Sequence, residues 1–309
     1  MSLAFIFPGQ GSQSEGMLNT LAAEYAEVEA TYREASDVLG YDLWDIVQNG
    51  PADKLNSTDI TQPAMLAAGV AVWRVWQAKG GAQPVVLAGH SLGEYTALVC
   101  GGSLAFTDAI KLVAERGRLM QAAVPAGTGA MAAVLGLEDD AVRQACSDVA
   151  AGDVLEAVNF NSPGQVVVAG NKAAVERVVD LAKERGAKRA LLLPVSVPSH
   201  CALMQPAAEQ LATVLKDVAI QTPSIPVINN TDVASPSEPD AIRDALVRQL
   251  YSPVRWVETI QKMAADGVDR LVECGPGKVL VGLNKRIERK MAAQAVFDPD
   301  SLNAALAEE

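Results

Sequence analysis

Residues 84–99 read Pro-Val-Val-Leu-Ala-Gly-His-Ser-Leu-Gly-Glu-Tyr-Thr-Ala-Leu-Val, and this stretch decides the fold. The apolar run up to Ala88 predicts a buried strand, and Glu94–Val99 predicts a helix, so the Gly-x-Ser-x-Gly motif between them has the strand-turn-helix setting of a nucleophile elbow. The two glycines permit a sharp turn. We therefore expect Ser91 to be a nucleophile near the positive end of that helix, where an oxyanion would be stabilised. The alternative is a structural turn in which Ser91 caps the helix.

Strands and helices alternate on both sides of this elbow. Upstream, an apolar run at Leu3–Phe7 predicts a strand, and two segments with helical spacing follow at 20–38 and 62–79. Downstream, the predicted order is a helix at 203–216, a strand at 226–228, helices at 240–250 and 253–266, a strand at 270–273 and a basic helix. Such alternation is typical of a mainly parallel sheet covered on both faces.

The pattern changes after Gly127. The predicted order becomes strand, helix, strand, strand, helix and strand, at 131–137, 138–150, 154–159, 165–170, 171–185 and 188–194. This βαββαβ order is that of a ferredoxin-like unit. We therefore predict an inserted subdomain at 127–197 and a catalytic core built from 1–126 and 198–309.

Composition excludes several classes of protein. Half of the 309 residues are apolar, which suits a globular protein with a large core. A formal net charge of −12 would repel nucleic acid and anionic membranes. No signal peptide and no run of the roughly 18 apolar residues that span a bilayer is visible, so a cytoplasmic protein is expected. The four cysteines lack C-x-x-C spacing and suggest neither disulfides nor a metal site.

A serine nucleophile needs a base, and histidine is the usual one at neutral pH. The chain has two histidines. His90 is adjacent to Ser91 and cannot easily turn its ring onto the serine hydroxyl, so we predict His200 as the general base and a structural role for His90. A third group should orient His200. The spacing of acidic residues identifies no candidate for it.

The loop Gly9-Gln10-Gly11 follows the first predicted strand. It is not a dinucleotide fingerprint, because Ser14 stands where the third Gly or Ala should be, and a nicotinamide cofactor is not expected. The same loop is a candidate for one N–H group of an oxyanion hole. The second would come from Leu92, directly after the nucleophile.

Several segments together carry a family resemblance. They are Pro8–Gln13, Gly89–Tyr95, Arg116-Gly117 with Met120-Gln121, Asn159–Pro163, Ser199-His200 and Gly275–Gly277. With these segments in order from about residue 3 to 290, the chain resembles the malonyl-CoA:acyl carrier protein transacylases. The resemblance implies an α/β-hydrolase-like core with a ferredoxin-like insertion.

The resemblance also implies roles for individual residues. Ser91 would be the nucleophile and His200 the base, with the backbone N–H groups of Gln10 and Leu92 as the oxyanion hole. The main-chain carbonyl of Gln249 would orient His200, in place of the missing carboxylate. Asn161 would be a residue of the substrate pocket.

Arg116 is one of several charges on the predicted helix 108–121, and an arginine in such a position is usually exposed. The family match at Arg-Gly-x-x-Met implies that it lies in the pocket instead, where its planar guanidinium can hold the free carboxylate of a malonyl group. Arg118 would then be the surface arginine. Because acetyl or alkyl groups would leave a buried guanidinium unpaired, they would be rejected.

The implied reaction is ping-pong transfer of malonyl from malonyl-CoA to the phosphopantetheine thiol of acyl carrier protein, through malonyl-Ser91, supplying extender units for fatty acid synthesis. We expect no metal and no bound cofactor. An acidic carrier would need a local basic patch on this acidic enzyme. Two clusters are candidates: Lys183, Arg185, Lys188 and Arg189, and Lys278, Lys285, Arg286, Arg289 and Lys290. Either cluster is equally compatible with an ordinary solvated helix face.

Three other functions remain open from the sequence. A serine hydrolase would use the same elbow and base but release the acyl group to water. An acyltransferase that prefers methylmalonyl or another extender is a second alternative. A non-catalytic binding module is a third, although a decayed site should have lost at least one of Ser91, His200 and Arg116.

Overall fold

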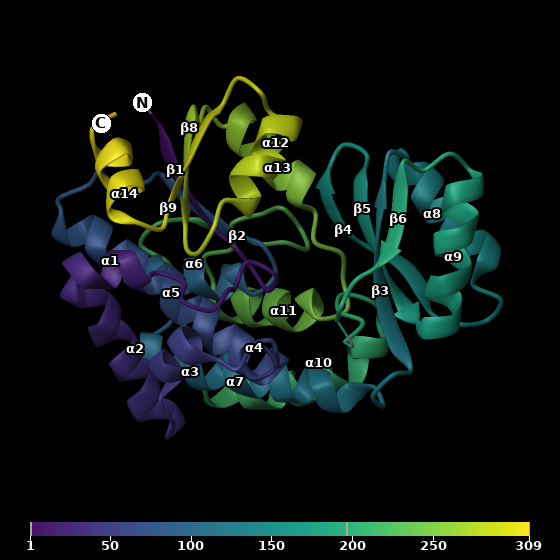
Figure 1. Cartoon of the computed structure of the whole chain (residues 1–309), viewed down its shortest axis with the longest axis horizontal. Helices are drawn as coiled ribbons and strands as arrows, with labels where there is room; N and C mark the ends of the chain where they lie inside the picture. Colours follow the sequence, from purple (N-terminus) through teal and green to yellow (C-terminus); the bar gives the residue numbers. More distant parts are fainter. Residues whose placement is uncertain (1, 196, 309) are drawn as a thin grey trace.

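Two sheets, each with its own helices, make up the molecule (Figure 1). The computed structural model describes residues 2–195 and 197–308. The larger sheet has the strand order β7-β2-β1-β8-β9 and parallel pairings throughout. The smaller sheet has the order β4-β5-β3-β6 and antiparallel pairings. The predicted α/β class, with a parallel core sheet and a ferredoxin-like unit, is confirmed.

The large sheet is built from segments far apart in the sequence. Its strands are β1 (Leu3–Phe7), β2 (Val86–Gly89), β7 (Val227–Ile228), β8 (Arg270–Cys274) and β9 (Ala292–Val296). The helices before the small sheet are α1 (Asn19–Glu24), α2 (Ala26–Leu39), α3 (Leu43–Asn49), α4 (Ala52–Leu55), α5 (Thr58–Ala78), α6 (Gly93–Cys100) and α7 (Phe106–Ala123). Those after it are η1 (Ala202–Met204), α10 (Gln205–Val214), η2 (Leu215–Asp217), α11 (Pro239–Gln249), α12 (Trp256–Ala265), α13 (Val279–Ile287) and α14 (Pro299–Leu306).

Helices cover both faces of the large sheet, which explains why β1 is apolar at every position. Phe5 packs edge-on against Trp73 and Trp76 of α5, with ring centroids 5.2 and 5.1 Å away. Ile6, the next residue, belongs instead to the core that contains residues of α12 and α13. Successive side chains of a strand point to opposite faces, so each layer receives alternate residues of β1.

The six elements of the small sheet follow the predicted βαββαβ order. They are β3 (Gly129–Leu135), α8 (Asp139–Val149), β4 (Leu155–Ser162), β5 (Gln165–Asn171), α9 (Lys172–Glu184) and β6 (Arg189–Leu192). One face of the sheet and the apolar faces of α8 and α9 form a separate core. The elements lie within residues 127–197, while the domain boundaries themselves remain a prediction.

Several details differ from the sequence prediction, among them helices α3 and α4, which were not predicted. The helix expected at 20–38 is two helices, because Tyr25 has an extended backbone (φ −128°, ψ 106°) between α1 and α2. Helix α5 begins at Thr58 rather than at 62 and accommodates Pro63. At the C-terminus, β9 and α14 were not predicted, since Ala-Ala-Gln-Ala-Val has little β propensity and becomes a strand by pairing with β8.

Candidate active site

A cavity of ≈ 370 Å³ lies between the two sheets. The large sheet contributes the segments that follow β1 and β2, including Gln10 and Ser91. The small sheet contributes Met131, Asn159 and the segment that follows β6, including Val195. Polar groups thus gather at the carboxyl ends of parallel strands, where α/β folds place their ligands.

The elbow around Ser91 depends on two close backbone approaches. Ser91 has a φ of 52°, in the left-handed region, so its side chain projects from a sharp turn between β2 and α6. A Cβ added to Gly89 would lie 1.8 Å from the carbonyl carbon of Gly93, and one added to Gly93 would lie 2.1 Å from the carbonyl oxygen of Phe7. Only glycine fits at either position.

Ser91 and His200 meet inside the cavity. The serine hydroxyl lies 2.8 Å from Nε2 of His200, and Nδ1 of the same ring lies 2.8 Å from the main-chain carbonyl oxygen of Gln249. This carbonyl can only accept, so Nδ1 carries a proton and Nε2 is left to accept the serine proton. A main-chain carbonyl therefore takes the place that a carboxylate has in a Ser-His-Asp triad.

The charge state of His200 follows from its burial. Its side chain is 2% exposed, and desolvation, followed by the positive charge of Arg116, lowers its pKa to about 3. The ring is consequently neutral near pH 7. A neutral imidazole is the form that can take a proton from Ser91.

Two residues that line the cavity have backbone N–H groups that are free to bind an oxyanion. Gln10 and Leu92 both line the cavity. Within the described part of the chain, neither backbone N–H has a hydrogen-bond partner. Unpaired N–H donors beside a nucleophile are the arrangement that stabilises a tetrahedral oxyanion.

Arg116 is buried in the wall of this cavity, as the family resemblance implied. It is 1% exposed, and its Nη1 and Nη2 donate to the side-chain oxygens of Gln62 (2.8 Å) and Gln249 (3.0 Å). Its Nε has no partner among the described residues. By contrast, Arg118 is exposed and pairs with Glu115. The cavity therefore holds a buried cation whose hydrogen bonds go to neutral amides and not to a carboxylate.

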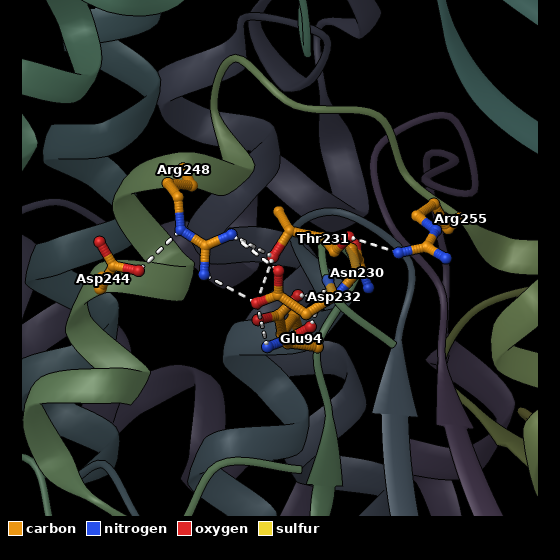
Figure 2. Close-up of polar contacts among 8 residues, drawn as sticks. Glu94, Asn230, Thr231, Asp232, Asp244, Arg248 and Arg255 are labelled. Carbon is orange, nitrogen blue, oxygen red and sulfur yellow. Dashed lines mark hydrogen bonds and ion pairs between the residues drawn. The ribbon is translucent and has the colours of Figure 1, made fainter. Parts of the chain in front are cut away.

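A buried polar network behind the elbow was missed by the sequence analysis. Nε2 of Gln249 donates to the carbonyl oxygen of Ser91 (3.0 Å) and to Oε2 of Glu94 (2.8 Å). Oδ1 of Asn230 accepts from the Ser91 N–H (2.7 Å), and its Nδ2 donates to the carbonyl oxygen of Gly89 (2.7 Å). Figure 2 shows Glu94 beside Asn230. The backbone N–H of Asn230 donates a hydrogen bond to Oε2 of Glu94 (2.9 Å). The nucleophile is thus held from behind by two amide side chains.

The sequence does contain a signal for part of this network. Asn230 follows β7 as Gln10 follows β1 and Ser91 follows β2, and the ends of parallel strands meet at one edge. Glu94 is 2% exposed, and desolvation raises its pKa to about 7 despite the hydrogen bonds from Gln249 and Asn230. A glutamate in the first turn of a helix gives no sign in the sequence that it is buried.

Asn161 occupies a different place from the one predicted. Its Oδ1 lies 2.8 Å from Nε2 of His90, and the residue is not among the described residues that line the cavity. Asn159, on the same strand, lines it instead. Its amide oxygen is engaged by His90, so Asn161 supports the elbow through this contact, and its role in substrate binding stays a prediction. The His90 ring, expected to be structural, lies between this amide and Trp256 (centroids 5.5 Å apart).

Three further observations concern other classes of function. Among the described residues, no three His, Cys, Asp or Glu side chains are grouped so as to hold a metal ion. The four cysteines are free and buried. No described helix has the length and apolar character needed to cross a membrane.

Comparisons with known proteins agree with this geometry. Residues 4–296 match the acyl transferase domain family. A malonyl CoA-acyl carrier protein transacylase of Haemophilus influenzae is 63% identical over 302 residues, 97% of each chain, and that of Escherichia coli K12 is 58% identical over 303 residues, 98% of each.

Solved structures give the same result. A malonyl-transacylase in complex with its type II PKS acyl-carrier protein has a TM-score of 0.99 and 58% identity, with each chain covered to 100%. An acyl carrier protein S-malonyltransferase from Vibrio cholerae has a TM-score of 0.96 and 62% identity, covering 98% of this chain and 99% of that one. The chain described here therefore belongs to the malonyl CoA-acyl carrier protein transacylase family, within the acyl transferase domain family.

Proposed function

We propose that this enzyme transfers a malonyl group from malonyl-CoA to the phosphopantetheine thiol of acyl carrier protein. The observation that carries the proposal is the buried Arg116 guanidinium in the same cavity as the Ser91–His200 pair. The pair supplies acyl transfer, and the guanidinium supplies a counter-charge for an acyl group that ends in a carboxylate.

The first half-reaction acylates Ser91. His200 takes the hydroxyl proton on Nε2 while the serine oxygen forms a bond to the thioester carbonyl carbon. The resulting oxyanion is stabilised by the N–H groups of Gln10 and Leu92. When the carbon–sulfur bond breaks, the coenzyme A thiolate leaves with the proton from His200, and malonyl-Ser91 remains.

The second half-reaction reverses these roles with a different thiol. Nε2 of His200 accepts the proton of the phosphopantetheine thiol, whose sulfur attacks the ester carbonyl of malonyl-Ser91. The serine oxygen leaves and recovers its proton from His200. No metal or bound cofactor takes part in either half-reaction as we propose it, and malonyl-CoA and coenzyme A act only as substrate and product.

Arg116 separates this function from the alternatives. A general esterase or thioesterase has no need for a buried cation beside the acyl chain. Burying a guanidinium is costly when no carboxylate of the described residues bonds to it directly, although the charge of Glu94 acts on it from beyond Gln249. A malonyl carboxylate supplies that counter-charge and can engage the Nε group that lacks a partner. A binding module without catalysis would not require the Ser91–His200 hydrogen bond.

The two basic clusters predicted from the sequence form one surface. Arg189 of β6 pairs with Leu135 of β3, Leu135 pairs with Gln165 of β5, and Gln165 accepts a hydrogen bond from Nη1 of Arg286 (2.9 Å). With about 4.8 Å between strands, Arg189 and Gln165 are about 10 Å apart. Basic side chains therefore stand at both ends of one short row across the small sheet.

Ion pairs narrow the set of residues in this surface. Lys183 pairs with Asp180, and Arg185 pairs with Asp148, so their charges are locally offset. Besides Lys278, Lys285 and Arg289, four exposed cations of the clusters have no ion pair with any residue that the structure describes: Lys188, Arg189, Arg286 and Lys290. We propose that these four residues form the basic surface that receives the acidic carrier protein.

The cellular setting completes the proposal. Four cysteines that are free and buried are in keeping with a reducing compartment, and we propose the cytoplasm. We further propose that the malonyl units serve fatty acid synthesis. One solved relative is in complex with a type II PKS acyl-carrier protein, so the test below includes carriers of both pathways.

Intact-protein mass spectrometry tests the function. The protein is mixed with malonyl-CoA, acetyl-CoA or methylmalonyl-CoA, alongside Ser91→Ala. A malonyl adduct is expected on the wild type, absent from Ser91→Ala, stable in buffer, and discharged by holo carrier protein from a fatty acid or a polyketide pathway. Discharge by water at the same rate as by the carrier would indicate a hydrolase, and equal labelling by acetyl-CoA would remove the role given to Arg116.

A further inference from the structure

The side-chain amide of Gln249 connects the substrate cation to the nucleophile. Its Oε1 accepts from Nη2 of Arg116, and its Nε2 donates to the carbonyl oxygen of Ser91 and to Oε2 of Glu94. Gln249 is fully buried, and Arg116 and Glu94 are 1% and 2% exposed. The hydrogen bonds to Arg116 and Glu94 are buried and the one to Ser91 is partly buried, and an unmade bond in such a place is expensive.

These contacts allow one orientation of the amide. A guanidinium can only donate, so the group that faces Arg116 must be the amide oxygen. The carbonyl of Ser91 and the oxygen of Glu94 both accept, so the group that faces them must be the NH₂. Rotating the amide by 180° would set donor against donor on one side and acceptor against acceptor on the other. Glu94 thus helps to hold the Gln249 amide with its oxygen, and not its NH₂ group, toward Arg116.

The surroundings of Glu94 hold its carboxylate in place (Figure 2). Oε2 also accepts the backbone N–H of Asn230 (2.9 Å). Two residues after Asn230, the carboxylate of Asp232 accepts hydrogen bonds from Nη1 (2.9 Å) and Nη2 (2.7 Å) of Arg248. Arg248 directly precedes Gln249 on the chain. The Asp232–Arg248 ion pair thus links the segment of Asn230, which donates to Glu94, with the segment of Gln249, which Glu94 holds.

We propose that Glu94 is a positioning residue for acyl selection, which acts by holding the Gln249 amide with its oxygen toward Arg116. This inference rests on the proposed function, because it assumes that Arg116 binds the malonyl carboxylate. Without Glu94, the amide loses one of its two acceptors and Arg116 loses a fixed partner. Recognition of malonyl should then weaken, whereas an acyl group without a carboxylate should be affected little.

Two conservative substitutions separate hydrogen bonding from charge. Glu94→Gln keeps the length of the side chain and a carbonyl oxygen that can accept from both Gln249 and Asn230, but removes the charge. Glu94→Asp keeps the charge but shortens the side chain by one methylene, so that it reaches neither donor. If Glu94 contributes through its hydrogen bonds and not through its charge, Glu94→Gln should keep the preference for malonyl and Glu94→Asp should lose it.

The experiment measures kcat/KM for acylation of Ser91 by malonyl-CoA and by acetyl-CoA, using timed intact-mass measurements on the full chain. Glu94→Asp is expected to lower the malonyl-to-acetyl ratio about tenfold or more, and Glu94→Gln to keep it within about threefold of wild type. Leu98→Ala is the control, since it removes a buried side chain from the same helix outside this network. It should lower the thermal midpoint and leave the ratio unchanged.

Several results would overturn the inference. They are an unchanged ratio in Glu94→Asp, an equal loss with both acyl groups, and a loss in Glu94→Gln as large as in Glu94→Asp. Should Glu94→Asp not unfold cooperatively, Gln249→Met answers the same question, because it keeps the main-chain carbonyl but removes the amide, and an unchanged ratio there also overturns the inference. Failure of the proposed function looks different, since wild type itself would then form no malonyl adduct.

Discussion

Ser91 and His200 lie 109 positions apart in the chain, yet the serine hydroxyl and Nε2 of the histidine are 2.8 Å apart. The partner of His200 on its other side is the neutral carbonyl of Gln249. No carboxylate of the residues that the structure describes hydrogen-bonds the ring to stabilise an imidazolium, and burial together with the charge of Arg116 lowers the pKa of His200 to about 3.

This low pKa predicts an acylation rate that is nearly independent of pH. Because the pKa is lowered, the neutral base persists as pH falls and is lost only near pH 3. The value of kcat/KM for malonyl-CoA should stay within about threefold between pH 8 and pH 5, measured as single-turnover labelling of Ser91. A decline with a midpoint near 6.5 would show that His200 titrates as an ordinary solvated histidine.

Arg116 offers the most direct test of acyl selection. Arg116→Ala should lower kcat/KM for malonyl-CoA by about a hundredfold, because a charge-assisted hydrogen bond contributes about 1.5–3 kcal/mol and about 1.4 kcal/mol corresponds to a factor of ten. Labelling by acetyl-CoA should not fall.

Arg118→Ala is the matched control for this substitution. It lies on the same helix, is exposed and, among the described residues, pairs with Glu115, so both activities should equal those of wild type. A parallel loss of malonyl and acetyl labelling in Arg116→Ala would indicate a damaged fold rather than a lost contact with the substrate.

The sequence predicted those features of the site that depend on local pattern. Ser91 was found from its motif between an apolar strand and a helix, and His200 from the scarcity of histidine. Arg116 came only from family resemblance, because the helix pattern does not distinguish it from an exposed arginine. Glu94 and Asn230 were missed because their hydrogen bond joins segments 136 positions apart. Such pairs are set by the packing of strand ends, which local spacing does not report.

Glycine at the elbow can be tested by stability. Gly93→Ala places a Cβ 2.1 Å from the carbonyl oxygen of Phe7, where the strand backbone cannot give way. The free energy of unfolding is therefore expected to fall by about 4 kcal/mol or more. Gly282→Ala provides the contrast, because this glycine is exposed on α13 with no atom near its added Cβ.

The Gly282→Ala variant should be more stable than wild type by about 0.5–1 kcal/mol, the difference in helix propensity between the two residues. Denaturant titration of both variants measures the free energy of unfolding, which should fall in Gly93→Ala and rise in Gly282→Ala. A Gly93→Ala protein as stable as wild type would mean that the helix and strand are not in the close contact described.

The basic surface predicts different effects on the two half-reactions. Reversing charge at Lys188 and Arg189, or at Arg286 and Lys290, should slow discharge of malonyl-Ser91 by holo carrier protein, and should do so most at low ionic strength. Acylation from malonyl-CoA should be spared, because Arg189 is four residues, about 13 Å of extended chain, from the cavity wall that begins at Leu193.

The row that joins the two clusters adds a sharper expectation. If Arg189 and Arg286 contact one carrier molecule, each single reversal should slow transfer, and the two losses should add within about 0.5 kcal/mol in the double variant because the residues are more than about 10 Å apart; if each cluster were a separate docking site, each single reversal alone should have little effect. Charge reversal at Lys183 and Arg185 is the control, since these cations already pair with Asp180 and Asp148. Equal transfer rates in all of these variants would exclude this surface as the docking site and direct attention to the rest of the cavity rim.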